Sequence, residues 1–195
     1  MIEQVIRIAQ QAGAEILRYY NQYEIQVTTK EDNSPLTNAD LASDRIIRNE
    51  LTSRYDIPCL SEEAVIDFEA RKTWTRFWLI DPLDGTKEFI NKIGEFTVNI
   101  ALIDNGKPVL GVIYCPAKNE TYYAAVGFGA WYEKNGELLH LPCTKPSRKI
   151  IATGSRFHLS QVDKAFNEAN NITDMIQVGS SLKFGLVASG KATLY

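Results

Sequence analysis

Cysteine and histidine are scarce in this sequence of 195 residues. The three cysteines, Cys59, Cys115 and Cys143, are odd in number, lie far apart and form no Cys-x-x-Cys pair. Neither a disulfide framework nor a zinc knuckle is therefore expected, and a reducing compartment fits this use of cysteine. The two histidines, His140 and His158, have no partner at metal-ligand spacing, so we expect surface or structural roles for both.

Long apolar runs and an excess of basic residues are also missing. The N-terminal stretch, residues 1–20, carries charges throughout and lacks the apolar region of a signal peptide. No later stretch reaches the ~20 apolar residues of a membrane-spanning helix. The 21 basic and 24 acidic residues give a net charge of −3 without a basic patch, which argues against a nucleic-acid polymer as partner. A small anionic substrate stays open, because bound metal ions can supply positive charge locally.

Hydrophobic periodicity predicts layers of helix and strand. Apolar residues at helical spacing predict a helix over residues 2–20, with Ile2, Val5, Ile6, Ala9, Ala12, Ile16, Leu17 and Tyr20 on its buried face. Thr37 and Asp40 form a capping-box pattern that predicts a second helix over about 38–53. Strands are predicted near 25–27 and at 57–60, 77–80, 97–103, 109–114, 120–126, 129–133, 137–141, 149–153 and 174–178, and another strand opens at 192–195. Turns are predicted at 33–35, 104–106 and 135–136. Two later helices are predicted at about 159–169 and 180–189.

This order of elements indicates an α+β chain, in which two helices and a mostly antiparallel strand region precede alternating helix and strand. We divide it into an N-terminal α+β metal-binding region, residues 1–145, and an incomplete C-terminal α/β region, residues 146–195.

Acidic residues that follow two apolar strands carry the functional signal. The run Phe77–Ile80 stops at Asp81, Pro82 forces a turn, and Asp84 returns a second carboxylate to the same point. The segment Leu60–Glu63 likewise ends an apolar strand in acids. Converging carboxylates repel one another unless a divalent cation neutralises them, and Mg²⁺ prefers such oxygen ligands. Two ions of this kind can activate a water and stabilise both oxygens of a phosphoryl transfer.

Each signal also has a plainer interpretation. Asp-Pro and Asp-Gly are common turn dipeptides, Glu62 and Glu63 alone suit a solvated loop, and Asp40 alone suits a helix cap. The functional interpretation depends on their combination. The segment 185–192 nearly spells a phosphate-binding P-loop, but it has Ala192 where Ser or Thr is needed, and Gly190 is better explained as a helix C-cap.

Together these motifs resemble the inositol monophosphatase superfamily. Asp81–Thr86 after an apolar strand, the acidic motif Leu60–Glu63 and the earlier segment Thr29–Asp40 match its motifs. Its bacterial 3'(2'),5'-bisphosphate nucleotidase branch is similar in three further segments, Gly85–Phe89, Gly94–Leu102 and Val178–Phe184. The resemblance covers the whole chain and implies a layered α-β-α-β-α sandwich of the sugar-phosphatase type with its C-terminal part missing. The family continues past the position of Tyr195 to a Trp-Asp motif whose aspartate completes the second metal site.

The resemblance also implies a reaction. It implies hydrolysis of 3'-phosphoadenosine 5'-phosphate to AMP and phosphate, dependent on two or three Mg²⁺ ions, inhibited by lithium and linked to sulfate assimilation. Glu62, Asp81 and the Leu83 carbonyl would bind one ion, while Asp81 and Asp84 would bind the second. The implied catalytic residues are Asp40, Thr86 and Glu62, with the Asp40–Thr86 pair acting as general base toward water. The implied substrate contacts are Glu62, Leu83, Asp84, the backbone N–H groups of Gly85 and Thr86, and Ser180 and Lys183 at the second phosphate.

Two other hypotheses stay open. An inositol-1-phosphate or related monophosphatase is one, although Lys87, Glu88 and the Ser180–Lys183 segment argue against it. An inactive truncated fragment is the other, suggested by the apolar strand at which the chain stops. The expected partner is a small nucleotide bisphosphate, with no nucleic-acid polymer and no integral membrane contact. The expected location is the cytoplasm, with peripheral association at the inner membrane left open, and the oligomeric state is not predicted.

Overall fold

A seven-stranded sheet forms the centre of the protein. The computed structural model describes residues 1–195 except 23–26, 30–34, 146–148 and 158–159. The strand order of the sheet is β3-β4-β5-β6-β7-β8-β9, with β3 parallel to β4 and every later pair antiparallel. This confirms the mostly antiparallel prediction. The strands are β3 (Cys59–Ser61), β4 (Arg76–Asp84), β5 (Thr97–Asp104), β6 (Lys107–Cys115), β7 (Glu120–Ala125), β8 (Gly129–Lys134) and β9 (Glu137–His140).

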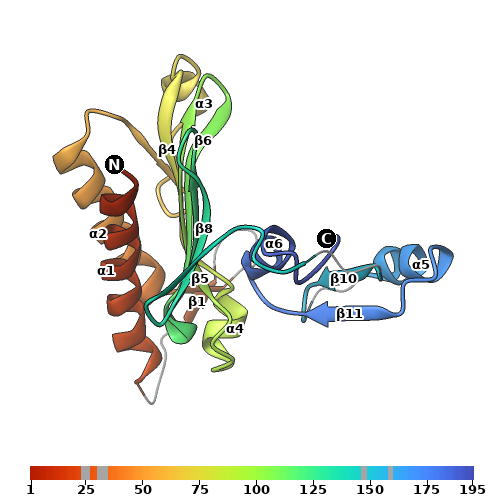
Figure 1. Ribbon diagram of the computed structural model, residues 1–195. Helices are drawn as coiled ribbons and strands as arrows, with labels where there is room; N and C mark the ends of the chain where they lie inside the picture. Colours follow the sequence, from red (N-terminus) through yellow and green to blue (C-terminus); the bar gives the residue numbers. More distant parts are fainter. Residues whose placement is uncertain (23–26, 30–34, 146–148, 158–159) are drawn as a thin grey trace.

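Two long helices, α1 (Ile2–Tyr20) and α2 (Asn38–Arg54), cover one face of this sheet (Figure 1). The predicted Thr37–Asp40 capping box opens α2, with the Thr37 backbone N–H donating to Asp40 Oδ2 at 2.8 Å. The predicted buried face of α1 omitted Ile8, which is fully buried, and included Ile6, which is only partly buried. Helical spacing fixes a stripe but not its edges, because the width depends on how the sheet curves beneath it.

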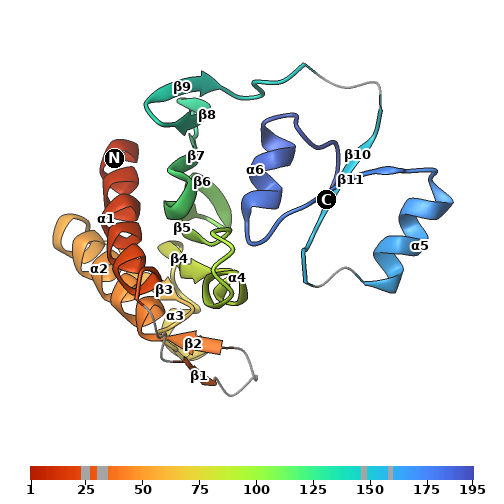
Figure 2. The same ribbon diagram turned by 90° about the horizontal axis from the view of Figure 1, so that it is seen from below.

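The remaining layers lie on the other face of the sheet. Figure 2 shows α6 (Leu182–Ala188) next to the sheet, then the parallel pair β10 (Ile151–Gly154) and β11 (Asp174–Gln177), then α5 (Gln161–Ala169). This order is the predicted α-β-α-β-α sandwich. The predicted strand opening at the end of the chain is also confirmed, because Leu194 bridges to Ala152 of β10 in parallel.

The predicted end of the central strand was wrong, and several short elements were missed. The sequence predicted that the central strand would stop at Ile80, but β4 continues through Pro82 to Asp84 with a shift in register. Short elements were not predicted, because too few residues carry a periodic signal. These are α3 (Phe68–Arg71), α4 (Thr86–Ile90), the 3-10 turn η1 (Pro116–Lys118) and the strand β2 (Pro35–Thr37), which pairs with β1 (Val27–Thr29).

Other predictions can be placed more simply. Gly190 follows α6 with φ +77°, as expected for a C-cap, so the P-loop-like segment does close a helix. Residues 25, 33, 34 and His158 lie outside the described residues, and the division at residue 145 stays a prediction. None of the helices in the described ranges combines the length and the apolar character needed to cross a lipid bilayer.

Gly13 allows α1 to approach the sheet closely. A Cβ there would lie 2.5 Å from Tyr114 Cε1 and 2.8 Å from Pro116 Cγ. Gly13→Ala should therefore destabilise the protein by ~1 kcal/mol or more, because overpacking outweighs the gain in helix propensity of ~1 kcal/mol. Chemical denaturation measures this, with the exposed Ala14→Gly as a control that reports propensity alone. A Gly13→Ala protein more stable than wild type would contradict the close approach.

Candidate active site

Two strand ends bring the predicted acids together. Ser61 of β3 pairs in parallel with Ile80 of β4, and the next backbone N–H, that of Glu62, donates to the Ile80 carbonyl at 3.1 Å. Parallel strands end at the same edge of a sheet, so Glu62 arrives beside Asp81, and the two side chains share a hydrogen bond. Glu62 and Asp81, which follow two different strands in the sequence, are therefore neighbours in the folded chain.

A bulge in β4 brings Asp84 to the same edge. Asp81 pairs with Asn99 and Asp84 pairs with Thr97, so three steps along β4 face two steps along β5. The extra residue bends the strand, and Pro82 fits there because it cannot donate to the ladder. Ser43 of α2 fixes the bulge by donating to the Pro82 carbonyl at 2.7 Å.

Asp81 is the most perturbed acid of this group. Burial raises the pKa of Asp81 to about 8, aided by the negative charges of Asp84 and Glu62 and opposed by a hydrogen bond from Asn99. Its Oδ1 atom is buried and has no hydrogen-bond partner among the described residues. Buried polar atoms are normally paired, so this oxygen lacks a partner that a cation could supply. The donors at this edge are all hard oxygens, and this donor set fits Mg²⁺.

The acidic side chains that the structure describes at this edge do not by themselves form a complete metal-binding cluster. Across the described ranges, no three acidic, histidine or cysteine side chains form a ready-made metal cluster. The predicted set needs two carboxylates for each ion, with the Leu83 carbonyl as a further ligand of one. The Leu83 carbonyl accepts a hydrogen bond from Thr86 Oγ1 at 3.4 Å, and its role as a metal ligand stays a prediction.

Asp40 and Thr86 meet, as the resemblance implied. Thr86 Oγ1 donates to Asp40 Oδ1 at 3.4 Å, although the two residues are 46 positions apart. Asp40 is 1% exposed, and its Oδ2 accepts from the Thr37 backbone N–H and hydroxyl. The α2 cap thus holds one oxygen of this carboxylate and directs the other toward Thr86 and the carboxylate edge.

Gly85 links β4 to α4 in a conformation that favours glycine. Its φ is +88°, and a Cβ there would lie 3.0 Å from the Glu95 carbonyl oxygen and 3.1 Å from Ser180 Cβ. The chain can therefore pass closely under the turn that contains Ser180. Phosphate binding by the Gly85 and Thr86 backbone N–H groups stays a prediction.

Ser180 and Lys183 lie close to the acids. Ser180 Oγ donates to Asp84 Oδ2 at 2.7 Å, and the backbone N–H of the neighbouring Ser181 donates to the same oxygen at 2.6 Å. Lys183 is buried, with its ammonium donating to the Ser180 carbonyl and lying 5.4 Å from the centre of the Tyr195 ring. Contact of Ser180 and Lys183 with a second phosphate stays a prediction.

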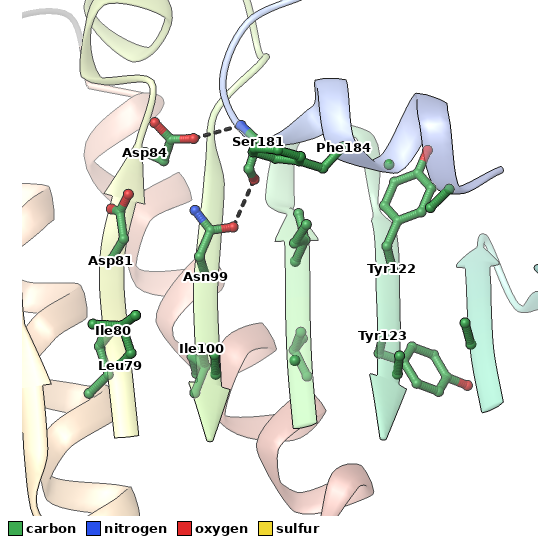
Figure 3. Close-up of a pocket in the computed structure, with 18 of the residues that line it drawn as sticks. Leu79, Ile80, Asp81, Asp84, Asn99, Ile100, Tyr122, Tyr123, Ser181 and Phe184 are labelled. Carbon is green, nitrogen blue, oxygen red and sulfur yellow. Dashed lines mark hydrogen bonds between the residues drawn. The ribbon is translucent and has the colours of Figure 1, made fainter. Parts of the chain in front are cut away.

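Three polar residues of this site were not predicted from the sequence, namely Thr97, Asn99 and Ser181. Asn99 donates to Asp81 and accepts from the Ser181 hydroxyl at 2.8 Å, as Figure 3 shows for the latter bond. Thr97 Oγ1 lies 2.6 Å from Ser180 Oγ and 2.8 Å from Ser181 Oγ. A signal existed, because Thr97 and Asn99 are polar residues two apart in an otherwise apolar strand and so share one face.

An apolar groove of about 820 Å³ extends from the acids between the sheet and α6 (Figure 3). Asp81, Asp84 and Asn99 lie at one end of it. Its apolar walls include Leu79, Ile100, Val112, Tyr122, Phe184 and Ala188.

Comparison with known proteins agrees with this geometry. The inositol monophosphatase family matches residues 1–195. The chain is 46% identical over 199 residues to the 3'(2'),5'-bisphosphate nucleotidase CysQ of Shigella flexneri, covering 100% of this chain and 79% of that protein. The crystal structure of CysQ from Bacteroides thetaiotaomicron is similar with a TM-score of 0.86 and 37% identity, covering 98% of this chain and 77% of that one. The Thermotoga maritima IMPase TM1415 is similar at 25% identity with a TM-score of 0.79, covering 96% and 72%.

Proposed function

Because this chain belongs to the inositol monophosphatase family, we propose that it is a Mg²⁺-dependent 3'(2'),5'-bisphosphate nucleotidase that hydrolyses 3'-phosphoadenosine 5'-phosphate to AMP and phosphate. Its 46% identity to a protein of that name supports the substrate. The observation that carries the proposal is the meeting of Glu62, Asp81 and Asp84 at one sheet edge, where Asp81 Oδ1 is buried without a hydrogen-bond partner among the described residues.

Glu62, Asp81 and the Leu83 carbonyl would hold one ion, and Asp81 and Asp84 would hold the second. Bound there, Mg²⁺ would supply positive charge to the phosphate oxygens and make a water easier to deprotonate. The three carboxylates of Glu62, Asp81 and Asp84 would offset most of the charge of two such ions. Asn99 keeps Asp81 oriented by donating to it, and this agrees with the usual support that neighbouring groups give to metal ligands.

Asp40 and Thr86 would act on the water. The Thr86 hydroxyl can accept a proton from the water while it donates its own to Asp40, which is the general-base role. The capping bonds on Asp40 Oδ2 leave Oδ1 as the oxygen that takes part. Glu62 would help to place the same water. No covalent intermediate with the protein is involved.

The substrate would enter with its scissile phosphate at the Gly85–Thr86 backbone, and with Ser180 and Lys183 toward its second phosphate. We further propose two or three Mg²⁺ ions, inhibition by lithium, a link to sulfate assimilation and a cytoplasmic location. The cysteine content supports that location.

Phosphate release from two substrates tests the proposed activity. We expect release from 3'-phosphoadenosine 5'-phosphate in the presence of Mg²⁺, no release in EDTA, and release from inositol 1-phosphate at least about tenfold slower, which corresponds to ~1.4 kcal/mol of transition-state binding. Faster hydrolysis of inositol 1-phosphate would favour a monophosphatase instead. No release from either compound at any Mg²⁺ concentration would contradict both.

A further inference from the structure

Glu95 is a buried carboxylate that links three segments of the chain. It lies two residues before the start of β5, and it is 8% exposed. Arg156, after β10, donates to both of its oxygens at 3.1 and 3.0 Å. Lys118, at the end of η1, donates to Oε1 at 3.2 Å. The backbone N–H of Gly179, before α6, donates to Oε2 at 2.9 Å.

These bonds hold Glu95 ionised. Burial alone raises the pKa of Glu95, but the hydrogen bonds from Arg156, Gly179 and Lys118 outweigh burial and leave the pKa below its ordinary value. An ionised acceptor makes stronger hydrogen bonds than a neutral one, so the bond to the Gly179 backbone N–H is charge-assisted.

The residue after Gly179 is strained. Ser180 has φ +59°, in the left-handed region that costs a non-glycine residue ~1 kcal/mol or more. Such a conformation persists only where the surroundings enforce it. Around Ser180, the Glu95 carboxylate accepts a hydrogen bond from the preceding Gly179 backbone N–H. Thr97 Oγ1 is hydrogen-bonded to the Ser180 hydroxyl at 2.6 Å.

Close packing also helps to hold Gly179, the residue before the strained Ser180, in place. A Cβ on Gly179 would lie 2.5 Å from Cγ of Glu88, a buried residue of α4, so this position has room for glycine alone. Gly179 is thus held by a hydrogen bond to the Glu95 carboxylate and by close packing against the Glu88 side chain.

The strained turn ends on a proposed metal ligand. Ser180 Oγ and the Ser181 backbone N–H both donate to Asp84 Oδ2, at 2.7 and 2.6 Å. Two donors on one oxygen fix the rotation of the carboxylate and therefore the direction of Oδ1. Asp84 is 96 positions before Ser180, so only tertiary structure can hold this geometry.

We propose that Glu95 is a positioning residue, which, through Gly179, holds the Ser180–Ser181 turn against Asp84 and so orients that carboxylate for a divalent cation. The inference rests on the proposed function for the assignment of Asp84 as a metal ligand. Arg156 and Lys118 act through Glu95 by keeping it ionised and in place. Glu95 itself touches neither substrate nor the reacting atoms.

Glu95→Gln tests this role in two ways. Mn²⁺ binding to the purified chain, followed by electron paramagnetic resonance, should weaken at least about tenfold, as is typical when a group that supports a metal ligand is removed. Amide hydrogen exchange at Gly179 and Ser181 should accelerate, because the glutamine keeps an acceptor but loses its charge. Arg156→Ala should give the same changes from a more exposed position, since its side chain is 38% exposed.

Two controls separate positioning from stability. Lys118→Ala removes one bond to Glu95 and leaves the two Arg156 bonds and the Gly179 bond, so it should weaken Mn²⁺ binding less than Arg156→Ala does. Ile8→Val trims the core beneath α1 and should lower stability with no change in Mn²⁺ affinity or in exchange at Gly179.

Wild-type Mn²⁺ affinity in Glu95→Gln would overturn the proposal, as would an equal loss of affinity in Ile8→Val. If wild-type protein bound no Mn²⁺, the metal site of the proposed function would fail instead. The exchange measurement would still decide the part played by Glu95, because unchanged exchange at Gly179 and Ser181 in Glu95→Gln would refute its hold on the turn.

Discussion

Asp81→Asn should abolish phosphate release and yet make the metal-free protein more stable. The loss of activity should be about a thousandfold or more, because Asp81 would serve both ions and several kcal/mol of charge stabilisation would be lost with it. The gain in stability follows from removing a buried carboxyl whose neighbours, Glu62 and Asp84, carry the same charge. In EDTA at pH 8 we expect the melting temperature to rise by roughly 2–4 °C for each kcal/mol gained.

The pH dependence of this gain has a defined sign. The pKa of Asp81 is raised from an ordinary 3.8 to about 8, so between these values the folded state holds a proton that the unfolded state has lost. Stability therefore falls as pH rises through this window. The difference between Asp81→Asn and wild type in EDTA should be smallest near pH 4 and largest near pH 8.

Added Mg²⁺ should reverse the order of stability, because a ligand stabilises only the protein that binds it. Glu137→Gln is the matched control, since it removes an exposed carboxylate at the far end of the sheet and should change neither activity nor the response to Mg²⁺. A metal-free Asp81→Asn protein less stable than wild type at pH 8, or one that still hydrolyses substrate normally, would contradict the site.

Removing the Asp40–Thr86 pair should give the second largest effect. Asp40→Asn and Thr86→Val should each lower kcat by about 10²–10⁴-fold, the usual contribution of a general base, with little change in KM. The two residues act as one unit, so the double variant should be no slower than the worse single variant. Steady-state rates at saturating Mg²⁺ measure this.

Thr86→Ser is the control for that pair, because it keeps the hydroxyl that donates to Asp40 Oδ1 and should stay within about tenfold of wild type. Asp40→Asn still offers an oxygen to the Thr37 backbone N–H, so the α2 cap should lose at most ~1 kcal/mol. Multiplying losses in the double variant would show that Asp40 and Thr86 act independently, against the proposed role.

Local signals explain the parts of the fold that the sequence predicted well. The helix at 2–20 has a long apolar stripe, and the turns at Asn105-Gly106 and Asn135-Gly136 adopt the positive φ angles that these residue pairs favour. The meeting of Glu62 with Asp81 was also predictable, because both follow apolar strands and parallel strands end at one edge.

Long-range contacts explain what the sequence did not predict. Thr97 and Asn99 meet Ser181 across more than 80 positions, and no local pattern states which polar residues will face each other at that separation. The continuation of β4 past Pro82 was missed for a related reason, because a proline turn signal gives no information about the bulge and the Ser43 bond that accommodate it. The roles of Ser180, Lys183 and the Gly85–Thr86 backbone stay predictions.

Mg²⁺ titration of wild type and Glu62→Gln by isothermal calorimetry tests most directly whether acids from two separate strand ends share a cation. Glu62 follows β3, whereas Asp81 and Asp84 belong to β4, so a shared ion would draw its ligands from two separate strands. We expect saturable binding to wild type and at least tenfold weaker binding to Glu62→Gln. Identical isotherms for the two proteins, or no saturable binding by wild type, would contradict the account.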